Sequence, residues 1–220
     1  MQQYSFPDNT CEGLIVHPDE RADWLKQRML AERGDVLRTV DYLDQIALIL
    51  CQHVRDYIAE SYGARRFVPV LVMRGGLVMR LAVERVFPQS PMGLIVPFRK
   101  SSLEEPGIVY GDVPAPSYDA LYLVCDLLLA TGRTMIAALE SVYANVRPVV
   151  GDEMQVVVLT PFAAYVGVQS VLEQFPDVVI HAIWHQEKVD ENQRMIGPGF
   201  DIGDYALGGE SPRRVQWAWE

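Results

Sequence analysis

A short turn after a run of apolar residues carries the clearest chemical pattern in the sequence. The run covers residues 120–124, the carboxylate of Asp126 follows it, and an amphipathic helical segment comes after the turn. A loop that leads from the carboxyl end of a parallel strand into a helix presents N–H groups and the helix dipole, which favour phosphate. Thr131 and Thr134 add hydroxyl groups, and Gly132 lets the backbone approach a ligand or adopt a positive φ. The pattern predicts a phosphate-binding cradle; the alternative is an ordinary strand-to-helix turn with Asp126 as a cap.

A second candidate site follows another apolar run, at residues 67–73. Arg74 and the pair Gly75 and Gly76 come directly after it. Paired glycines after a strand let the main chain approach a ligand and present its N–H groups, and a guanidinium group supplies planar, multidentate donors for an anion. The alternative is that the glycines only permit a sharp turn and that Arg74 points to solvent.

Two later segments could also offer polar groups to a ligand. Arg99 follows the apolar run 92–98, and the long segment 101–117 is polar and rich in proline and glycine. A segment of this kind predicts either a functional lid or a disordered loop. Residues 195–205 combine glycines, a proline and aspartates, so they either offer their backbone to a ligand or form a turn-rich connector.

Composition limits the classes of protein to which these residues can belong. The chain has 220 residues and a formal net charge of −10, which argues against broad binding to nucleic acid or membrane surfaces. The three cysteines are far apart and predict a reducing compartment rather than a disulfide framework or a zinc site. The spacing of His181 and His185 on one predicted strand argues against a metal site. Because neither a signal peptide nor a membrane span is visible, we expect a soluble cytoplasmic protein.

The elements that must position these residues alternate between strands and helices. This rhythm predicts a single α/β domain over residues 1–220, with a parallel sheet flanked by helices. We expect an N-terminal helical region at 1–66, a core sheet at 67–185 and a small C-terminal loop at 186–210. The pattern predicts an irregular lead-in over 1–18, helices over 19–33, 37–58, 77–86, 135–142 and 163–175, and strands over 67–73, 92–98, 120–124, 155–159 and 178–184.

Taken in order, these segments resemble the motifs of the uracil phosphoribosyltransferase family. Residues 72–77 are similar to its pyrophosphate loop, and residues 97–99 with 103–106 are similar to its second arginine and the loop that follows. Residues 125–134 resemble the family's signature for 5-phosphoribosyl 1-diphosphate, and residues 196–204 resemble its uracil-binding hood. The resemblance implies a phosphoribosyltransferase-like sheet with N-terminal helices and a small C-terminal hood.

The resemblance also implies an activity, conversion of uracil and 5-phosphoribosyl 1-diphosphate to UMP and pyrophosphate in pyrimidine salvage. The alternatives are a phosphoribosyltransferase for another base or heterocycle, and a non-catalytic nucleotide-binding regulator. Small-molecule substrates, a homodimer or higher homo-oligomer, and Mg²⁺ held by Asp201 through water are implied as well. The implied catalytic residues are Asp201 and Arg99. The implied donor-binding residues are Arg74, Gly75, Arg99, Asp126, Ala130, Thr131, Gly132, Arg133, Thr134 and Asp201, and the implied base-binding residues are Ile196, Phe200, Asp201 and Ile202.

The sequence departs from the family's motifs at several positions. Leu127 stands where the family usually has a proline, Arg133 where it has a second glycine, and Lys100 where it has an aspartate. The hood is one residue short, with Phe200 directly before Asp201, which implies a reshaped base pocket. The segment before the core sheet leaves no room for the family's β-arm, so the usual dimer contacts are not implied.

Overall fold

The computed structural model describes residues 11–32, 35–61, 66–98, 106–186, 189 and 195. Its helices are α1 (Glu20–Ala31), α2 (Val36–Ser61), α3 (Gly75–Val78), α4 (Arg80–Val86), α5 (Arg133–Val150) and α6 (Tyr165–Gln174), with a 3₁₀ turn, η1, at Gly151–Glu153. Its strands are β1 (Leu14–Val16), β2 (Arg66–Val72), β3 (Gly93–Phe98), β4 (Gly107–Asp112), β5 (Ala120–Cys125), β6 (Leu128–Leu129), β7 (Gln155–Leu159), β8 (Phe162–Ala164), β9 (Val179–Ala182) and β10 (Trp184–Gln186). Among the helices of these described residues, none is both long and apolar enough to cross a bilayer.

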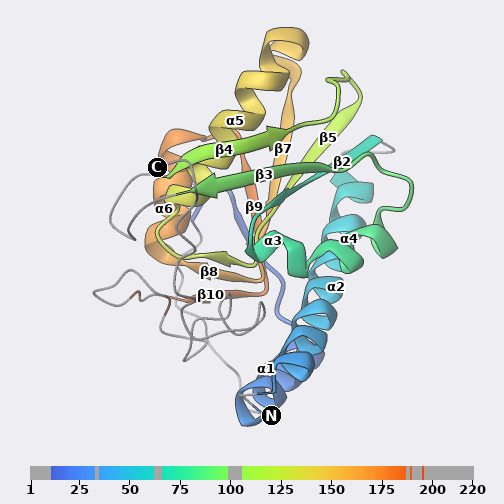
Figure 1. The fold of residues 1–220 in the computed structure, drawn as a ribbon, viewed down its shortest axis with the longest axis vertical. Coiled ribbons are helices and arrows are strands. Elements are labelled where there is room, and N and C mark those ends of the chain that lie inside the picture. Colours follow the sequence, from blue (N-terminus) through green and yellow to red (C-terminus); the bar gives the residue numbers. More distant parts are fainter. Residues whose placement is uncertain are drawn as a thin grey trace, which may run out of the picture.

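A seven-stranded sheet forms the centre of the molecule (Figure 1). Its strand order is β1-β9-β7-β5-β2-β3-β4, and every pairing is parallel except that of β3 with β4. All six residues of β5 are buried, as expected for a central parallel strand covered on both faces. The predicted α/β fold with a parallel sheet is therefore confirmed.

Helices cover the two faces of this sheet, and the side chains of β5 alternate between them. Leu121 and Leu123 pack with α1, α2 and α4, whereas Tyr122 and Val124 pack with α5 and α6. The period of two along a strand makes this division. Figure 1 shows α2 along one side of the sheet and α5 on the other.

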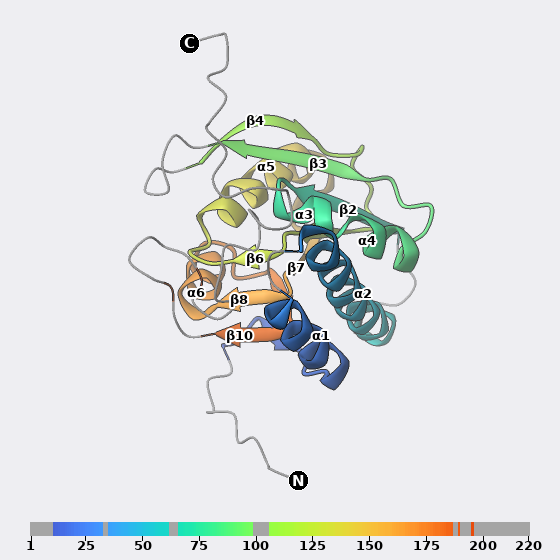
Figure 2. The ribbon, with the colours of Figure 1, turned by 60° about the horizontal axis from the view of Figure 1, so that its bottom comes forward.

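A second, three-stranded sheet continues the main one beyond its carboxyl edge. Its strands, in the order β10-β8-β6, each follow a main-sheet strand after a short break: β6 follows β5, β8 follows β7, and β10 follows β9. Backbone hydrogen bonds bridge the break, because Asp126 N–H donates to the Leu159 carbonyl at 3.1 Å and Thr160 N–H donates to the His181 carbonyl at 3.0 Å. Figure 2 shows this small sheet beside α1 and α6. The break places the chain after Cys125 in the small sheet, beyond the carboxyl edge of the main one.

The first strand and helix are joined to the rest of the fold by polar contacts. β1 pairs with β9, and Nε2 of His17, directly after β1, lies 2.8 Å from Nδ1 of His181 on β9. The ring of His17 also stacks on His53 of α2, with centroids 5.2 Å apart. Asp19, the N-cap of α1, lies 2.9 Å from Nε2 of the same His53. The N-terminal segment is thus fixed to both the sheet and α2.

Several sequence-based element predictions were wrong at their edges. Residues 14–16 were predicted as part of an irregular lead-in but form β1, and residues 107–112 were predicted as loop but form β4. Both are sheet edges, and because β4 is almost entirely exposed, no apolar alternation marks it. The predicted strand 178–184 divides at Ile183, so His181 and His185 belong to different strands. The predicted helix 77–86 begins earlier and is interrupted at Met79.

Candidate functional site

Two loops that the sequence singled out meet at the carboxyl edge of the sheet. β2 and β5 are neighbours, with Leu71 opposite Cys125, so the turns that follow them lie side by side. A β-carbon on Gly75 would overlap the carboxylate of Asp126, and one on Gly76 would lie 2.5 Å from the Cys125 carbonyl oxygen. Contacts this short leave room only for glycine at both positions.

Arg74 begins the first of these turns and its side chain is exposed. The peptide between Met73 and Arg74 is cis. The position of the turn places this arginine at the same edge of the sheet as the cradle.

The carboxylate of Asp126 is buried between the two loops, with 8 % of the residue exposed. The Leu127 N–H donates to its Oδ1 at 2.8 Å. Burial raises the pKa of Asp126 to about 7, although hydrogen bonds from the Leu127 and Leu128 backbone lower it. A carboxyl group with a pKa near neutrality in a loop at a sheet edge is typical of a functional site.

The predicted phosphate-binding cradle, residues 130–134, leads into the N-terminus of α5. Gly132 is the N-cap, with φ of +84°, and no side chain caps the helix there. Ile136 N–H donates to the Gly132 carbonyl at 2.8 Å. Because first-turn N–H groups of a helix have no intrahelical partner, an 18-residue helix that starts here presents donors and a positive dipole to the turn that holds Thr131.

The cradle turn packs closely on the first turn of α6, a contact that the sequence did not predict. A β-carbon on Gly132 would lie 2.8 Å from the Gly167 carbonyl oxygen, and a β-carbon on Gly167 would lie 2.5 Å from the Ala130 carbonyl oxygen. Gly167 is buried within α6. The sequence feature that could have indicated this contact is Gly167, because a glycine inside a predicted helix often has a packing reason.

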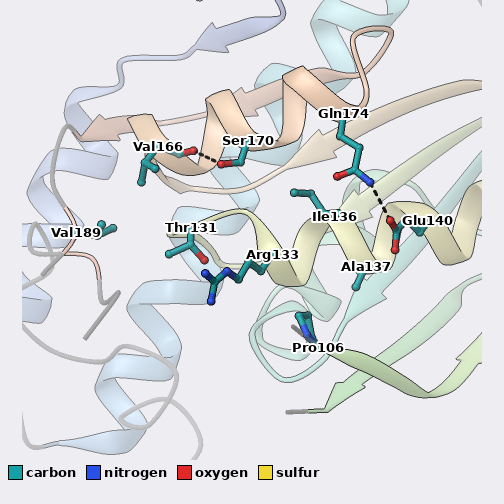
Figure 3. Close-up of a pocket in the computed structure, with 10 residues that line it drawn as sticks. All are labelled: Pro106, Thr131, Arg133, Ile136, Ala137, Glu140, Val166, Ser170, Gln174 and Val189. Atoms are coloured by element: carbon teal, nitrogen blue, oxygen red, sulfur yellow. Dashed lines mark hydrogen bonds between the residues drawn. The ribbon is translucent and has the colours of Figure 1, made fainter. Parts of the chain in front are cut away.

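An open groove of about 700 Å³ extends from the cradle along α5 and α6 (Figure 3). Glu140 and Gln174, joined by a hydrogen bond of 2.8 Å, bridge the two helices along this groove. Thr131 and Arg133 of the lining were predicted as donor-binding residues, and Pro106 belongs to the segment that resembles the family's loop. The lining residues are Pro106, Thr131, Arg133, Ile136, Ala137, Glu140, Val166, Ser170, Gln174 and Val189. Those on α5 share one face at helical spacing, which only the packing of α6 turns into a groove.

The structure brings together one group of the predicted site residues, and another group lies outside the described residues. Together at the carboxyl edge are the turn residues Arg74 and Gly75, the carboxylate of Asp126, and the cradle residues Ala130, Thr131, Gly132, Arg133 and Thr134. Outside the described residues lie Arg99, Ile196, Phe200, Asp201 and Ile202. Within the described part of the chain, no three His, Cys, Asp or Glu side chains are grouped so as to hold a metal ion.

The chain has the fold of the type I phosphoribosyltransferases, a class of enzymes that transfer a pentosyl group. The AQ2163 protein of Aquifex aeolicus has this fold, with a TM-score of 0.76 and 18 % identity over 88 % of this chain and 97 % of that one. An adenine phosphoribosyl transferase from Trypanosoma brucei superposes with a TM-score of 0.57 at 12 % identity, over 94 % of each chain.

The sequence model of uracil phosphoribosyltransferase matches residues 39–208. A uracil phosphoribosyltransferase from Pyrobaculum islandicum is 30 % identical over 154 residues, which are 67 % of this chain and 69 % of that relative. The chain belongs to the uracil phosphoribosyltransferase family. The resemblance found in the sequence is therefore confirmed at the level of the family and the fold.

Proposed function

We propose that the protein transfers the phosphoribosyl group of 5-phosphoribosyl 1-diphosphate to uracil, giving UMP and pyrophosphate. The observation that supports this most is the contact between the Gly75 turn and Asp126. A donor with a phosphate at one end and a pyrophosphate at the other needs two anion sites that face a single cleft. The two turns satisfy that need because they follow neighbouring strands of one sheet.

In this proposal each turn binds one end of the donor. The uncapped N-terminus of α5, with the hydroxyl groups of Thr131 and Thr134, binds the 5-phosphate. The pyrophosphate lies against the turn that holds Arg74, and Arg99 gives it a second guanidinium group. Asp126, buried between the turns, accepts hydrogen bonds from the ribose hydroxyl groups.

The reaction itself is a displacement at the anomeric carbon. The bond to the pyrophosphate oxygen breaks, the bond to the uracil nitrogen forms, and that nitrogen loses its proton. The sugar passes through oxocarbenium character, as in glycosidic chemistry, so donors fixed on the leaving group lower the barrier most. Arg74 and Arg99 supply these donors, and Asp201 assists removal of the proton from the base.

The proposed reaction uses Mg²⁺ bound with the donor. Mg²⁺ prefers hard oxygen ligands and keeps several waters when it binds a substrate phosphate. Asp126 supplies a carboxylate between the two turns, which fits an ion held mainly by the donor. Asp201 would hold it through water, and the bound ion would neutralise charge on the pyrophosphate.

The acceptor is read by the segment that resembles the family's hood. Main-chain groups of Ile196 and Ile202 form hydrogen bonds with the edges of the pyrimidine, and Phe200 shapes the pocket. We propose a cytoplasmic enzyme that works as a homodimer or a higher homo-oligomer.

A panel of bases tests the acceptor. The purified protein is incubated with 5-phosphoribosyl 1-diphosphate, Mg²⁺ and one base at a time, and pyrophosphate release is measured. We expect uracil to give the highest kcat/KM and the product to be UMP. Turnover of another base in place of uracil would keep the reaction and change the substrate. Donor binding in a thermal-shift titration without turnover of any base would instead identify a nucleotide-binding regulator.

A further inference from the structure

Helix α1 contacts the small sheet, and the small sheet leads to the proposed donor site. The family match begins at residue 39, after the end of α1 at Ala31. Figure 2 shows α1 beside β10, and β8 and β6 follow in the order of the small sheet. β6 ends at Leu129, directly before the cradle. The small sheet therefore connects a helix that precedes the matched region with the cradle.

Two side chains of α1 hold one indole ring of β10. The Trp184 Nε1–H donates to Oδ1 of Asp23 at 2.8 Å. The ammonium group of Lys26 lies 4.7 Å from the centroid of the Trp184 ring and 5.9 Å from that of the Phe162 ring. The indole thus has a hydrogen bond at its edge and a cation at its face, two contacts that fix its orientation.

The indole in turn fixes Phe162 of β8. The rings of Trp184 and Phe162 are stacked, with centroids 4.7 Å apart and planes at 25°. The Trp184 N–H donates to the carbonyl of Pro161 at 3.0 Å, and Trp184 lies opposite Phe162 in the pairing of β10 with β8. Trp184 therefore holds Phe162, which is fully buried, through both its side chain and its backbone.

Phe162 holds the residue that orients the carboxylate of Asp126. The Phe162 N–H donates to the Leu127 carbonyl at 3.4 Å, and the Leu127 N–H donates to Oδ1 of Asp126 at 2.8 Å. Leu127 is fully buried, and its backbone nitrogen lies 3.2 Å from the position of a β-carbon on Gly75. The backbone of Leu127 thus joins Phe162 to the carboxylate that is proposed to bind the ribose hydroxyl groups.

The cradle also depends on β8. Phe162 pairs with Leu128 and Ala163 with Leu129, and the cradle follows directly after Leu129. On its other side the cradle packs on Gly167 of α6, a helix that begins at Tyr165, directly after β8. Both supports of the cradle therefore continue from the strand that Trp184 holds.

We propose that Trp184, held by Asp23 of α1, is a positioning residue for the phosphoribosyl donor, because it places Phe162 and, through the Leu127 backbone, orients Asp126. The proposal rests on the proposed function, in which Asp126 and the cradle bind the ribose and the 5-phosphate of the donor. It gives α1, a helix that precedes the matched region, a role in donor affinity.

The substitution Asp23→Ala tests this role, because it removes the acceptor of the indole N–H and leaves every proposed substrate-binding residue in place. Calorimetric titration with 5-phosphoribosyl 1-diphosphate and Mg²⁺, without a base, measures the Kd of the donor. We expect Asp23→Ala to raise this Kd about fivefold, as for partial loss of a charge-assisted hydrogen bond. The KM for the donor should rise by a similar factor while kcat changes less than about twofold, since a ribose contact made before and during the reaction acts on binding.

A double-mutant cycle shows whether the effect passes through the indole. Trp184→Phe keeps an aromatic ring beside Phe162 but has no N–H to donate. In that background Asp23→Ala should change the Kd of the donor less than about twofold, because the hydrogen bond is already absent. A further rise of about fivefold would show that Asp23 acts by another route and would overturn the proposal.

Two matched variants separate positioning from a general effect of changing α1. Asp23→Asn retains an oxygen that can accept the indole hydrogen, so it should keep the Kd of the donor near that of the parent protein. Glu20→Ala removes an exposed carboxylate from the same first turn of α1 and should leave the Kd unchanged. An unchanged Kd in Asp23→Ala, or equal rises in Asp23→Ala and Asp23→Asn, would contradict the role of Trp184.

Hydrogen exchange follows the same path without any substrate. In Asp23→Ala the amides of Leu127 and Phe162 should exchange about tenfold faster than in the parent protein, while those of β5 keep their rates. Equal acceleration in β5 would indicate global loss of stability, and unchanged exchange at Leu127 and Phe162 would show that the path does not exist. Either result overturns the proposal.

The two measurements together distinguish this inference from the proposed function. Faster exchange at Leu127 with an unchanged Kd of the donor would show a purely structural contact and would overturn the inference alone. A parent protein that binds no donor would remove the proposed function, and the inference with it, whatever the exchange rates show.

Discussion

The carboxylate of Asp126 lies against Gly75, so that a β-carbon at position 75 would overlap its Oδ1. The two turns proposed to hold opposite ends of the donor are therefore in direct contact with each other. A substitution in one turn is expected to move the other.

The first prediction concerns this contact. Gly75→Ala should displace Asp126 and lower kcat/KM for the donor about tenfold or more, because a displacement of about 1 Å in groups that position a substrate can cost roughly a hundredfold in rate. Gly107→Ala is the matched control, since a β-carbon there meets no atom within 4 Å. Steady-state kinetics of both variants check the prediction, and equal effects of the two substitutions would contradict it.

A second prediction concerns the packing of the cradle on α6. Gly132→Ala combines an unfavourable backbone conformation, with φ of +84°, and a clash with the Gly167 carbonyl. Gly107→Ala is the control, because Gly107 has the backbone of a β-strand and a β-carbon there meets no atom within 4 Å. We expect Gly132→Ala to lower the free energy of unfolding by about 1–3 kcal/mol more than Gly107→Ala does. Urea unfolding measures the difference, and equal losses would argue against the packing contact.

The third prediction follows from the raised pKa of Asp126. Because burial raises this pKa from 3.8 to about 7, the folded protein keeps a proton between these pH values that the unfolded chain has released. The contribution of Asp126 to stability is therefore full below pH 3.8, falls progressively as the pH rises, and is lost once the pH has passed 7. Asp126→Asn should be more stable than the parent protein by roughly 1–3 kcal/mol at pH 8, with a smaller gain at pH 5. Its kcat/KM for the donor should fall, since an amide replaces the proposed ribose-binding carboxylate. A gain in stability that is independent of pH would contradict the assignment.

The fourth prediction concerns the stacked histidines at the sheet edge. Burial lowers the pKa of His181 to about 3, with the charge of His17 as a second cause, and burial with the charge of His53 lowers that of His17 to about 4. The other groups that face this cluster are Asp19 and Tyr57.

Since the unfolded chain binds these protons below pH 6.5 and the folded protein does not, stability is full above pH 6.5 and falls as the pH drops toward 4. His181 alone should account for roughly 2 kcal/mol between pH 7.5 and 5. Urea unfolding at the two pH values should show a smaller pH-dependent loss in His17→Asn than in the parent protein. Equal losses would show that the cluster does not control the acid response.

A fifth prediction tests the pyrophosphate turn. Arg74→Ala should raise the KM for the donor about tenfold or more, as expected for the loss of a guanidinium–phosphate contact. Arg80→Ala is a suitable control, because Arg80 is also exposed and its ion pair with Glu84 on α4 is of the kind that contributes little stability. A donor KM that is unchanged in Arg74→Ala would exclude the pyrophosphate contact.

The sequence was sufficient for the buried strands and for the turns that follow them. The apolar runs at 67–73, 120–124 and 155–159 correspond to β2, β5 and β7 within one or two residues. Such strands are covered on both faces, so nearly every side chain is apolar and the run is easily recognised. The glycines after β2 were also noticed, because paired glycines after a strand are rare without a packing or binding reason.

Features that depend on contacts between distant residues could not be found in the sequence. Gly75 was noted for its conformational freedom, but its actual constraint is the side chain of Asp126. The groove between α5 and α6, the contact of Trp184 with Asp23, and the stacking of His17 with His181 each join segments far apart in the chain. The spacing of residue types along the chain does not indicate which distant residues will be in contact.

The pairing of β1 with β9 has a consequence for where the chain can be shortened. The region matched by the family starts at residue 39, but β1, at Leu14–Val16, occupies the edge of β9. Removal of the residues before position 39 would leave the backbone of β9 open, and an open edge strand is a template for pairing with another molecule. Self-association through this edge, together with exposure of the core that Ala22, Leu25 and Met29 of α1 cover, is then expected of a protein trimmed to its family boundaries.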